Sequence, residues 1–209
     1  FKTPIVSIAG FAKLLRYGDL SGPERDEYLA IIEDESMRLS DMATNVLNMT
    51  KIENQTILSG VTRFNLSEQL RNCVLLLERK WTEKSLELDL EFNEYLIDGN
   101  EDLLRQVWMN LLGNAVKFTP PGGTVRIAVQ DTGDALTVSV SNTGSSIPPD
   151  KLETIFRKFY QADESHAAEG NGLGLPIVRS VVRLHGGDVR AESADDYTTF
   201  TVRLPKHPS

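Results

Sequence analysis

Residues 110–120 of the chain read NLLGNAVKFTP and close a helix-like segment that starts near Asp102. Asn110, Asn114 and Lys117 stand at positions i, i+4 and i+7, which at about 100° per residue places them within roughly 60° of one another on a helix. A neighbouring arc carries the apolar residues Leu104, Trp108, Leu111 and Ala115. The pattern predicts a helix over residues 102–118 with one apolar face and one polar face.

The polar face of this predicted helix suits a phosphorylated ligand. Asparagine is a mediocre helix former, so two asparagines one turn apart above a lysine indicate a purpose other than helix stability. Amide oxygens are hard ligands that suit Mg²⁺, and a lysine suits phosphate. Phe118 lies at the edge of the same face, where it could stack on a base. For this segment alone, a solvated polar face is a fair alternative.

Two glycine-containing segments further along the chain add to this pattern. Residues 141–150, SNTGSSIPPD, follow a predicted strand; Asn142 offers a donor and an acceptor that could read an adenine edge, and Gly144 permits a tight turn or a close ligand. Residues 169–178, EGNGLGLPIV, precede a predicted helix, so their glycines expose backbone N–H groups toward an anion. Taken alone, the first segment is better explained as an ordinary turn at the end of a strand, and the second is only weak evidence against an ordinary surface loop.

Composition narrows the classes of function. The 209 residues are enough for one large domain or two small ones, and 40% are hydrophobic, which is sufficient for a packed core. A net charge of −8 argues against sequence-independent binding of nucleic acid and, more weakly, against contact with an anionic membrane. The single cysteine, Cys73, stands among apolar residues and is interpreted as a small buried hydrophobe. No apolar run approaches about 18 residues, so no membrane span is predicted.

The first region is predicted to be a helical hairpin. Residues 3–17 form one amphipathic stripe, and Ser21 with Glu24 is typical of a capped start of a second helix. That helix carries an apolar stripe close to a seven-residue repeat, from Tyr28 to Ile52. Such a hairpin either packs on the second domain or dimerises into a four-helix bundle, and the length of its stripes favours the dimer.

Beyond residues 54–65 the pattern changes to a mixture of helices and strands. Helices are predicted over residues 66–81, 102–118 and 175–185. Period-two alternation predicts strands over residues 86–92, 124–130, 135–141, 188–193 and 198–204. This order predicts an α+β fold with helices on one face of a mixed sheet.

In this order the segments resemble the catalytic core of sensor histidine kinases, within the GHKL ATPase superfamily that also holds gyrase, Hsp90 and MutL. NLLGNAVKF is similar to the family's asparagine box, SNTGSSI to its first glycine box, IFRKFYQAD to its F box, and GNGLGLPIVRSVVRLHGG to its second glycine box. The first residues, FKTPIVSIAGFAKLL, resemble the end of its phosphoacceptor motif. Gyrase-like relatives carry a glutamate where Asn110 stands, so the asparagine points to the kinases.

The resemblance implies two domains. Residues 1–58 would form the dimerisation and histidine-phosphotransfer hairpin, and residues 63–206 the ATP-binding domain, a Bergerat/GHKL-like α/β sandwich. The hairpin would form a homodimer through residues 3–52, with the phosphorylated histidine just before Phe1. The resemblance also implies a cytoplasmic location, with any membrane anchor of the parent protein upstream. A response regulator, the phosphoryl acceptor, would dock on the hairpin near Ile5, Ala9, Ala12 and Lys13.

The implied cofactors are ATP and Mg²⁺. The implied metal ligands are Asn114 and Asn110, and the implied catalytic residues are Thr3, Asn110 and Lys117. Asn142 would read the adenine amine. The full set of implied ATP-binding residues is Asn110, Asn114, Lys117, Phe118, Asn142, Gly144, Ile147, Phe159, Gly170, Gly172, Leu173, Gly174 and Leu175.

Three positions depart from the family pattern. Asn142 stands where the family usually has aspartate, Ser146 where it has glycine, and Gln161 where it has arginine. These departures are evidence for an alternative function, a degenerate dimeric scaffold or phosphatase acting on a response regulator, whereas the retained asparagine box and second glycine box are evidence against it. A gyrase-like ATP hydrolase is disfavoured by Asn110. The three histidines of the chain are interpreted as structural or exposed, and His185 is expected to meet the last carbonyls of a helix.

Overall fold

The computed structural model describes residues 2–53, 55, 57–144, 146–160 and 172–208. It divides the chain into two compact units, residues 1–51 and residues 52–209. Among the described residues, no helix has both the length and the apolar character needed to cross a membrane. Three residues singled out from the sequence, Gln161, His166 and Gly170, lie outside the described ranges.

The first unit is the predicted helical hairpin. Helix α1 spans Lys2–Tyr17, and helix α2 spans Gly22–Glu53. The predicted capping at the start of α2 is confirmed, because the carboxylate of Glu24 accepts a hydrogen bond of 2.8 Å from the backbone N–H of Ser21. The Glu24 N–H in turn donates to the hydroxyl of Ser21 at 3.5 Å. The hydrogen bonds from Ser21 lower the pKa of Glu24.

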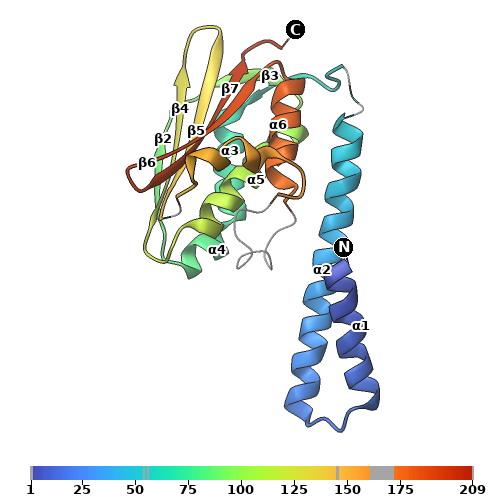
Figure 1. The fold of residues 1–209 in the computed structure, drawn as a ribbon. Helices are drawn as coiled ribbons and strands as arrows, with labels where there is room; N and C mark the ends of the chain where they lie inside the picture. The colour runs from blue at the N-terminus through green and yellow to red at the C-terminus, as the bar shows by residue number, and fades with distance from the viewer. Residues whose placement is uncertain (1, 54, 56, 145, 161–171, 209) are drawn as a thin grey trace. The chain divides into compact units, whose positions relative to one another are not determined.

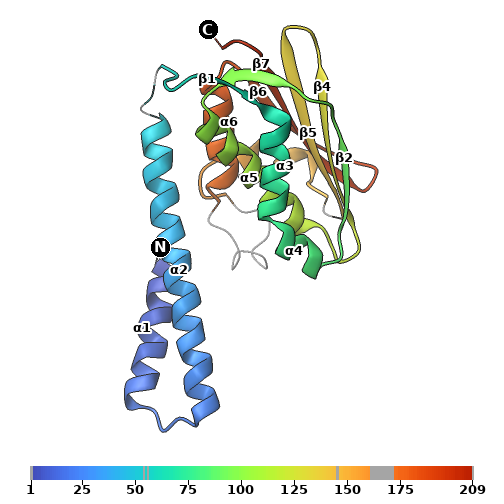
Figure 2. The same cartoon turned by 180° about the vertical axis from the view of Figure 1, so that it is seen from behind.

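The second unit is built on a five-stranded sheet in the order β2-β4-β5-β7-β6. Its strands are β2 (Glu87–Glu91), β4 (Thr124–Asp131), β5 (Ala135–Thr143), β6 (Asp188–Ala194) and β7 (Tyr197–Pro205). Strands β2 and β4 pair in parallel, and the other neighbours pair antiparallel. Helices α3 (Leu66–Leu76), α5 (Glu101–Phe118) and α6 (Gly174–Leu184) lie together on one side of this sheet (Figure 1; Figure 2 shows the same arrangement from behind). The predicted α+β fold with a mixed sheet is confirmed.

The core lies between the sheet and these helices. Along β5, Val138 and Val140 are buried while Ser139 and Ser141 are more exposed, as expected for a sheet with one covered face. Trp108 of α5 is fully buried, and its indole N–H donates to the side-chain oxygen of Gln69 at 2.8 Å. This hydrogen bond satisfies the polar group of the largest side chain in the core and joins α5 to α3.

The segment predicted to be helical, residues 66–81, is helical except at Leu77, where the chain ends α3 and begins a separate short helix α4 (Glu78–Glu83). In a continuous helix the carbonyl of Val74 would accept from the N–H of Glu78. Here it accepts instead from the N–H of Leu77 and from the indole N–H of Trp81, each at 3.1 Å. The carbonyl of Val74 is therefore occupied by these two donors at the point where α3 ends.

Two short strands were not predicted from the sequence, β1 (Thr62–Asn65) and β3 (Leu96–Gly99), which pair antiparallel as a separate two-stranded sheet. Each has four residues, which is too short for the alternation of apolar and polar residues to stand out.

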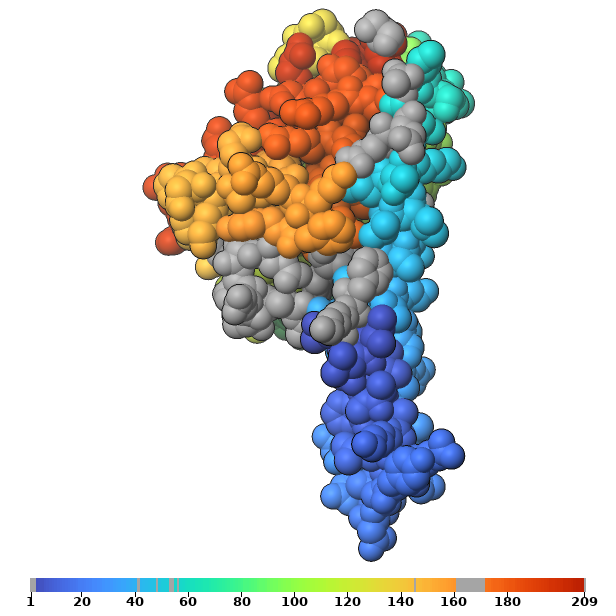
Figure 3. Space-filling view, turned by 45° about the vertical axis from the view of Figure 1, so that its right-hand side comes forward, coloured from blue at the N-terminus to red at the C-terminus, as the bar shows by residue number. Residues whose placement is uncertain are grey.

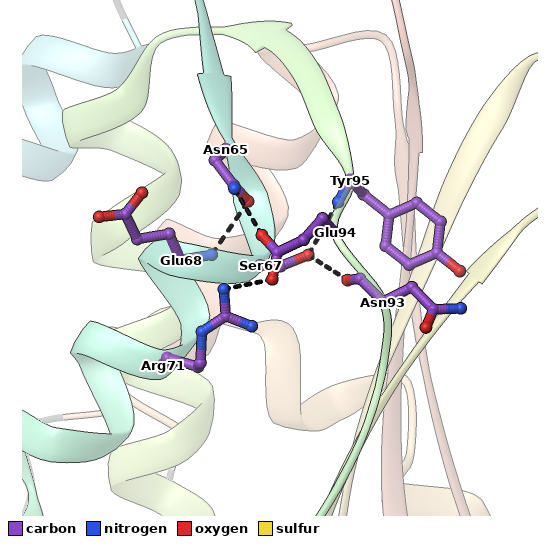
Figure 4. A network of polar contacts seen from close by, with 7 residues as sticks. All are labelled: Asn65, Ser67, Glu68, Arg71, Asn93, Glu94 and Tyr95. Carbon is purple, nitrogen blue, oxygen red and sulfur yellow. Dashed lines mark hydrogen bonds and ion pairs between the residues drawn. The ribbon is translucent and has the colours of Figure 1, made fainter.

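A network of hydrogen bonds connects the start of α3 to the loop before β3 (Figure 4). The side chain of Asn65 accepts from the N–H of Glu68 at 3.1 Å, which caps the helix, and donates to Glu94 at 2.6 Å. Arg71 donates to the other carboxylate oxygen of Glu94 at 2.6 Å. These hydrogen bonds, first from Asn65 and then from Arg71, lower the pKa of Glu94. The Ser67 hydroxyl bonds to two backbone groups of the same loop.

Candidate functional site

Helix α5 carries the polar face predicted from its sequence. The helix begins at a cap in which the Asn100 side chain accepts from the N–H of Leu103 at 3.0 Å. Asn110, Asn114 and Lys117 are half-buried, whereas the apolar residues of the neighbouring arc are buried. Within the part of the chain that the structure describes, the side-chain amides of Asn110 and Asn114 make no hydrogen bond, so their oxygens can serve a ligand.

The last turn of α5 presents a cation beside an aromatic ring. The ammonium nitrogen of Lys117 lies 4.7 Å from the ring centroid of Phe118, a cation–π distance. Phe118 is 39% exposed, although it is a large apolar residue at the end of a helix that packs in the core. The exposed ring of Phe118 offers a surface on which a base can stack, and the ammonium group of Lys117 offers a positive charge that suits phosphate.

The start of α6 lies against this polar face. A Cβ atom added to Gly174, the first residue of α6, would lie 3.0 Å from the side-chain oxygen of Asn110. The N-cap residue is Leu173, whose buried side chain has no acceptor for the first N–H groups of the helix. Leu175 follows, half-buried. The Asn110 amide, which has no hydrogen bond among the described residues, therefore lies at a helix N-terminus, where the N–H groups and the helix dipole favour an anion.

Asn142 lies on the covered side of the sheet near the end of β5. It is 3% exposed and pairs in register with Val125 of β4 and Thr198 of β7. Its side-chain NH₂ donates to the carbonyl of Thr143 at 3.2 Å. This bond leaves the amide oxygen as the group available to accept from a ligand.

Gly144 follows with φ +94°, a left-handed conformation that glycine adopts without strain. A Cβ atom at this position would overlap Pro120, lying 2.8 Å from its Cγ atom. The space left by the missing side chain is therefore taken by the proline that follows α5. This contact joins the loop after β5 to the end of the helix that carries Asn110 and Asn114.

The segment between β5 and α6 is anchored to α6. It contains two short 3₁₀ helices, η1 (Pro149–Lys151) and η2 (Thr154–Phe156), which lie next to α6 in the space-filling view (Figure 3). Arg179 of α6 donates to Glu153 at 2.7 Å and stacks 4.7 Å over the ring of Phe156. The N–H of Ile147, at the start of the segment, donates to the Ser193 hydroxyl of β6 at 3.1 Å.

Phe159 and Gly172 meet on either side of residues 161–171. Phe159 is 58% exposed and has φ +61°, a conformation that is uncommon for an aromatic residue. Its N–H donates to the carbonyl of Gly172 at 3.0 Å. Gly172 has φ +65°, and a Cβ atom there would lie 2.8 Å from the carbonyl carbon of Phe159. The F-box segment and the second glycine segment are thus joined through their backbones.

Most of the residues expected to bind ATP lie in the second unit, in the segments just described, whereas Gly170 lies outside the described residues. The remaining predicted residues lie on α1 in the first unit, which is described by itself. All are exposed there; they are Thr3, Ile5, Ala9, Ala12 and Lys13. Among the described residues, no cluster of three or more His, Cys, Asp or Glu side chains is arranged to hold a metal.

The interpretations of His185 and Cys73 are both confirmed. Nδ1 of His185 lies 2.8 Å from the carbonyl oxygen of Val181, at the end of α6, and Nε2 accepts from the backbone N–H of Asn100 at 3.0 Å. Burial lowers the pKa of His185. Cys73 is fully buried, and burial raises the pKa of its thiol to about 11. A thiol with so high a pKa is not a nucleophile near neutral pH.

Two side chains near the site were missed by sequence reasoning. Arg179 anchors the F-box segment, and Lys84 donates hydrogen bonds to three carbonyls at the end of α5. Both are common surface residue types, and their partners lie 26 to 35 residues away in the sequence. Nothing in local spacing signals such contacts.

Comparison with known proteins agrees with this geometry. Residues 99–208 match the family described as histidine kinase-, DNA gyrase B-, and HSP90-like ATPase, and residues 1–55 match the His Kinase A (phospho-acceptor) domain. The chain belongs to the sensor histidine kinase family. It is 33% identical over 211 residues to the sensor protein VanS of Enterococcus faecium, a match covering 99% of this chain and 55% of VanS.

Two solved structures cover this kinase core over 99% of its length. One is the histidine kinase ThkA in complex with the response regulator protein TrrA, with a TM-score of 0.83, 27% identity and 59% of that chain covered. The other is full-length ShkA in complex with AMPPNP, with a TM-score of 0.75, 28% identity and 44% of that chain covered. The kinase core spans between 28% and 55% of the length of the first curated relatives that it matches.

Proposed function

We propose that this chain is the catalytic core of an ATP-dependent protein-histidine kinase. The observation that carries the proposal is the meeting of α5 and α6, where the side-chain oxygen of Asn110 lies against Gly174 at the helix start. The Asn110 amide lies there beside the helix N–H groups, and Asn114 and Lys117 follow at positions i+4 and i+7 of α5. This set suits the phosphates of a nucleotide. The relative ShkA was solved in complex with AMPPNP.

The proposed roles follow from the position of each side chain. Asn114, with Asn110 beside it, would hold Mg²⁺ through amide oxygens, and the ion would neutralise charge on the phosphates. Lys117 binds phosphate oxygens. Phe118 flanks the adenine, and the amide oxygen of Asn142 accepts from its amine. Catalysis then rests on positioning and charge neutralisation, as in phosphoryl transfer generally.

The remaining proposed binding residues act through backbone and packing. The N–H groups of Gly172, Gly174 and Leu175 face the phosphates at the start of α6, and Gly170 is proposed to extend this set. Leu173, Ile147 and Phe159 border the nucleotide with apolar surface. Gly144 contributes indirectly, because it allows Pro120 to close the loop behind the end of α5.

The proposed phosphoryl acceptor is a histidine preceding Phe1, and the final acceptor is an aspartate of a response regulator. The relative ThkA was solved in complex with the response regulator protein TrrA. In this chain, α1 presents Ile5, Ala9, Ala12 and Lys13 as exposed residues, a small and largely apolar surface suited to docking a receiver domain. Thr3, also exposed, would orient water for dephosphorylation of the regulator.

The helical hairpin is proposed to form a homodimer through residues 3–52. Two helices cannot enclose a core by themselves, and the hairpin leaves large apolar side chains exposed. They include Val6, Leu14, Tyr17, Leu29, Met37 and Leu47. Pairing with a second hairpin would cover them in a four-helix bundle. We place this part of the kinase in the cytoplasm, where ATP and response regulators are available.

Isothermal titration of ATP into the chain, with and without Mg²⁺, tests the proposal. We expect binding that strengthens with Mg²⁺, and loss of that Mg²⁺ dependence in Asn114→Ala. The matched control is Asn72→Ala, which removes an exposed asparagine from α3 and should leave ATP binding unchanged. Absence of ATP binding by the unaltered chain would contradict the kinase proposal.

A second candidate function rests on Asn142. A neutral amide forms a weaker hydrogen bond to the adenine amine than the carboxylate that the family usually carries. A chain that binds no nucleotide would then act as a dimeric scaffold or as a phosphatase of the response regulator. Dephosphorylation of a phosphorylated receiver domain without any nucleotide would favour this candidate.

A further inference from the structure

Lys84 holds the end of the helix that carries the proposed nucleotide ligands. Its ammonium nitrogen donates to the carbonyl oxygens of Val116 at 2.9 Å, Lys117 at 2.7 Å and Thr119 at 3.1 Å. All three belong to the last turn of α5 or to its C-cap residue. Lys84 itself is the C-cap residue of α4, so the contact joins two helices that Figure 2 shows next to one another.

The chemistry of this contact suits a lysine. The last carbonyls of a helix have no partner within the helix, and the helix dipole makes that end negative. An ammonium group has three donors and no acceptor, so three carbonyls use its full capacity. The Thr119 side chain and N–H both bond to the carbonyl of Ala115, which leaves the carbonyls of Val116 and Lys117 to Lys84.

The backbone of Lys84 fastens the loop that follows the helix. Its carbonyl accepts from the N–H of Gly122 at 2.9 Å. The same loop contains Pro120, which fills the space at Gly144. Lys84 therefore bonds both to the last turn of α5, which carries Lys117 and Phe118, and to the loop that leads into β4.

We propose that Lys84 is a positioning residue for nucleotide binding, acting by holding the turn from which Lys117 and Phe118 project. The inference rests on the proposed roles of those two residues. A cap that served stability alone would change the unfolding temperature and leave the affinity of the folded protein for ATP unaltered. A positioning residue changes that affinity, because a small displacement of a binding group weakens the interactions it makes.

Titration calorimetry of Mg²⁺–ATP with Lys84→Met tests this, at a temperature where circular dichroism shows the variant folded. Methionine keeps the length of the side chain and removes the charge and the donors. We expect ATP binding about tenfold weaker in Lys84→Met than in the unaltered chain. In the double variant, we expect ATP binding at most about threefold weaker than in Lys117→Met alone, because the effects of coupled residues do not add. Lys80→Met is the control, since Lys80 is exposed on the same helix.

The outcomes separate this inference from the proposed function. If the unaltered chain binds no ATP, the proposed function is wrong and the inference goes with it. If the unaltered chain binds ATP and Lys84→Met binds it equally well, only the positioning role is overturned. The same holds if the losses of ATP affinity from Lys84→Met and Lys117→Met add fully in the double variant. If Lys84→Met does not fold, Lys84→Arg provides the test. The planar guanidinium group of arginine cannot bond to all three carbonyls, so we expect a three- to fivefold loss of affinity for ATP. Unchanged affinity for ATP in Lys84→Arg would count against the proposal.

Discussion

The imidazole of His185 accepts a hydrogen bond of 3.0 Å from the backbone N–H of Asn100. The two residues are 85 positions apart, and they join the end of α6 to the start of α5. Because Nε2 is the acceptor, the ring is neutral and Nδ1 carries the proton toward the carbonyl of Val181. The two helices that form the candidate site are thus linked at their other ends by one neutral histidine.

This link predicts that the stability of the second unit falls on mild acidification. Burial lowers the pKa of His185 in the folded state below its value of about 6.5 in an unfolded chain. The unfolded chain then binds more protons, so the stabilisation is complete above about pH 6.5 and is lost as the pH falls toward the folded-state pKa. Urea unfolding at several pH values should show that the stability difference between the unaltered chain and His185→Gln is largest at pH 8 and shrinks by pH 5. A stability difference that is independent of pH would contradict the assignment.

Gly144→Ala should destabilise the second unit far more than Gly133→Ala. Both glycines have nearly the same left-handed conformation, with φ +94° and φ +91°, so the backbone strain of an alanine is alike. A Cβ atom at Gly133 meets nothing within 4 Å, whereas one at Gly144 overlaps Pro120. We expect about 1 kcal/mol for Gly133→Ala from strain and about 3 kcal/mol for Gly144→Ala, which adds the overlap. Equal losses in urea unfolding would show that Pro120 moves aside at no cost.

Gly174→Ala should weaken nucleotide binding with little effect on folding. The added Cβ atom would press on the side-chain oxygen of Asn110 at 3.0 Å and displace it from the start of α6. We expect about tenfold weaker binding of Mg²⁺–ATP in titration calorimetry, because the displaced group is a proposed ligand.

Gly113→Ala is the matched control on α5. Nothing lies within 4 Å of a Cβ atom at Gly113, and the position is interior to the helix. The substitution should keep ATP affinity and raise the free energy of unfolding by up to about 1 kcal/mol, since alanine is the better helix former. Unchanged ATP affinity in Gly174→Ala would remove Asn110 from the proposed site.

Asn142→Asp should strengthen ATP binding while lowering the stability of the free protein. A carboxylate accepts more strongly from the adenine amine than an amide does, and we expect about fivefold tighter binding. Without nucleotide, the same carboxylate would be buried next to the carbonyl of Thr143, which now accepts from the Asn142 amide. Thermal unfolding measures the loss of stability, and ATP titration measures the gain in affinity. Asn72→Asp, at an exposed position of α3, should show neither effect. Weaker ATP binding in Asn142→Asp would mean that this position does not face the adenine amine.

Much of the fold was predictable because each element carries its own pattern. The apolar arc of α5 and the alternation along β4, β5 and β7 follow directly from helical and strand periodicity. The break between α3 and α4 was not predictable in this way, because the side chain of Trp81 takes the carbonyl of Val74 that a continuous helix would use. Strands β1 and β3 were too short to show a period.

The candidate site likewise contains residues that could be predicted from the sequence and contacts that could not. Asn110, Asn114 and Lys117 were identified from a spacing of three and four residues, and the glycines from their place before α6. The contact of Asn110 with Gly174, the filling of the space at Gly144 by Pro120, and the anchoring of the F-box segment by Arg179 needed coordinates. Each joins residues that are distant in the sequence and belong to different elements.

The sequence alone determined most of the helices and strands, the family that the chain resembles, and which polar side chains stand on one face of α5. These properties depend on spacings of two to seven residues, which the geometry of a single helix or strand converts into a face. Only the tertiary structure decided what holds those side chains in place. Lys84 reaches its carbonyls across 32 to 35 residues and His185 reaches Asn100 across 85, and such pairs form only when the packing of sheet and helices brings them together.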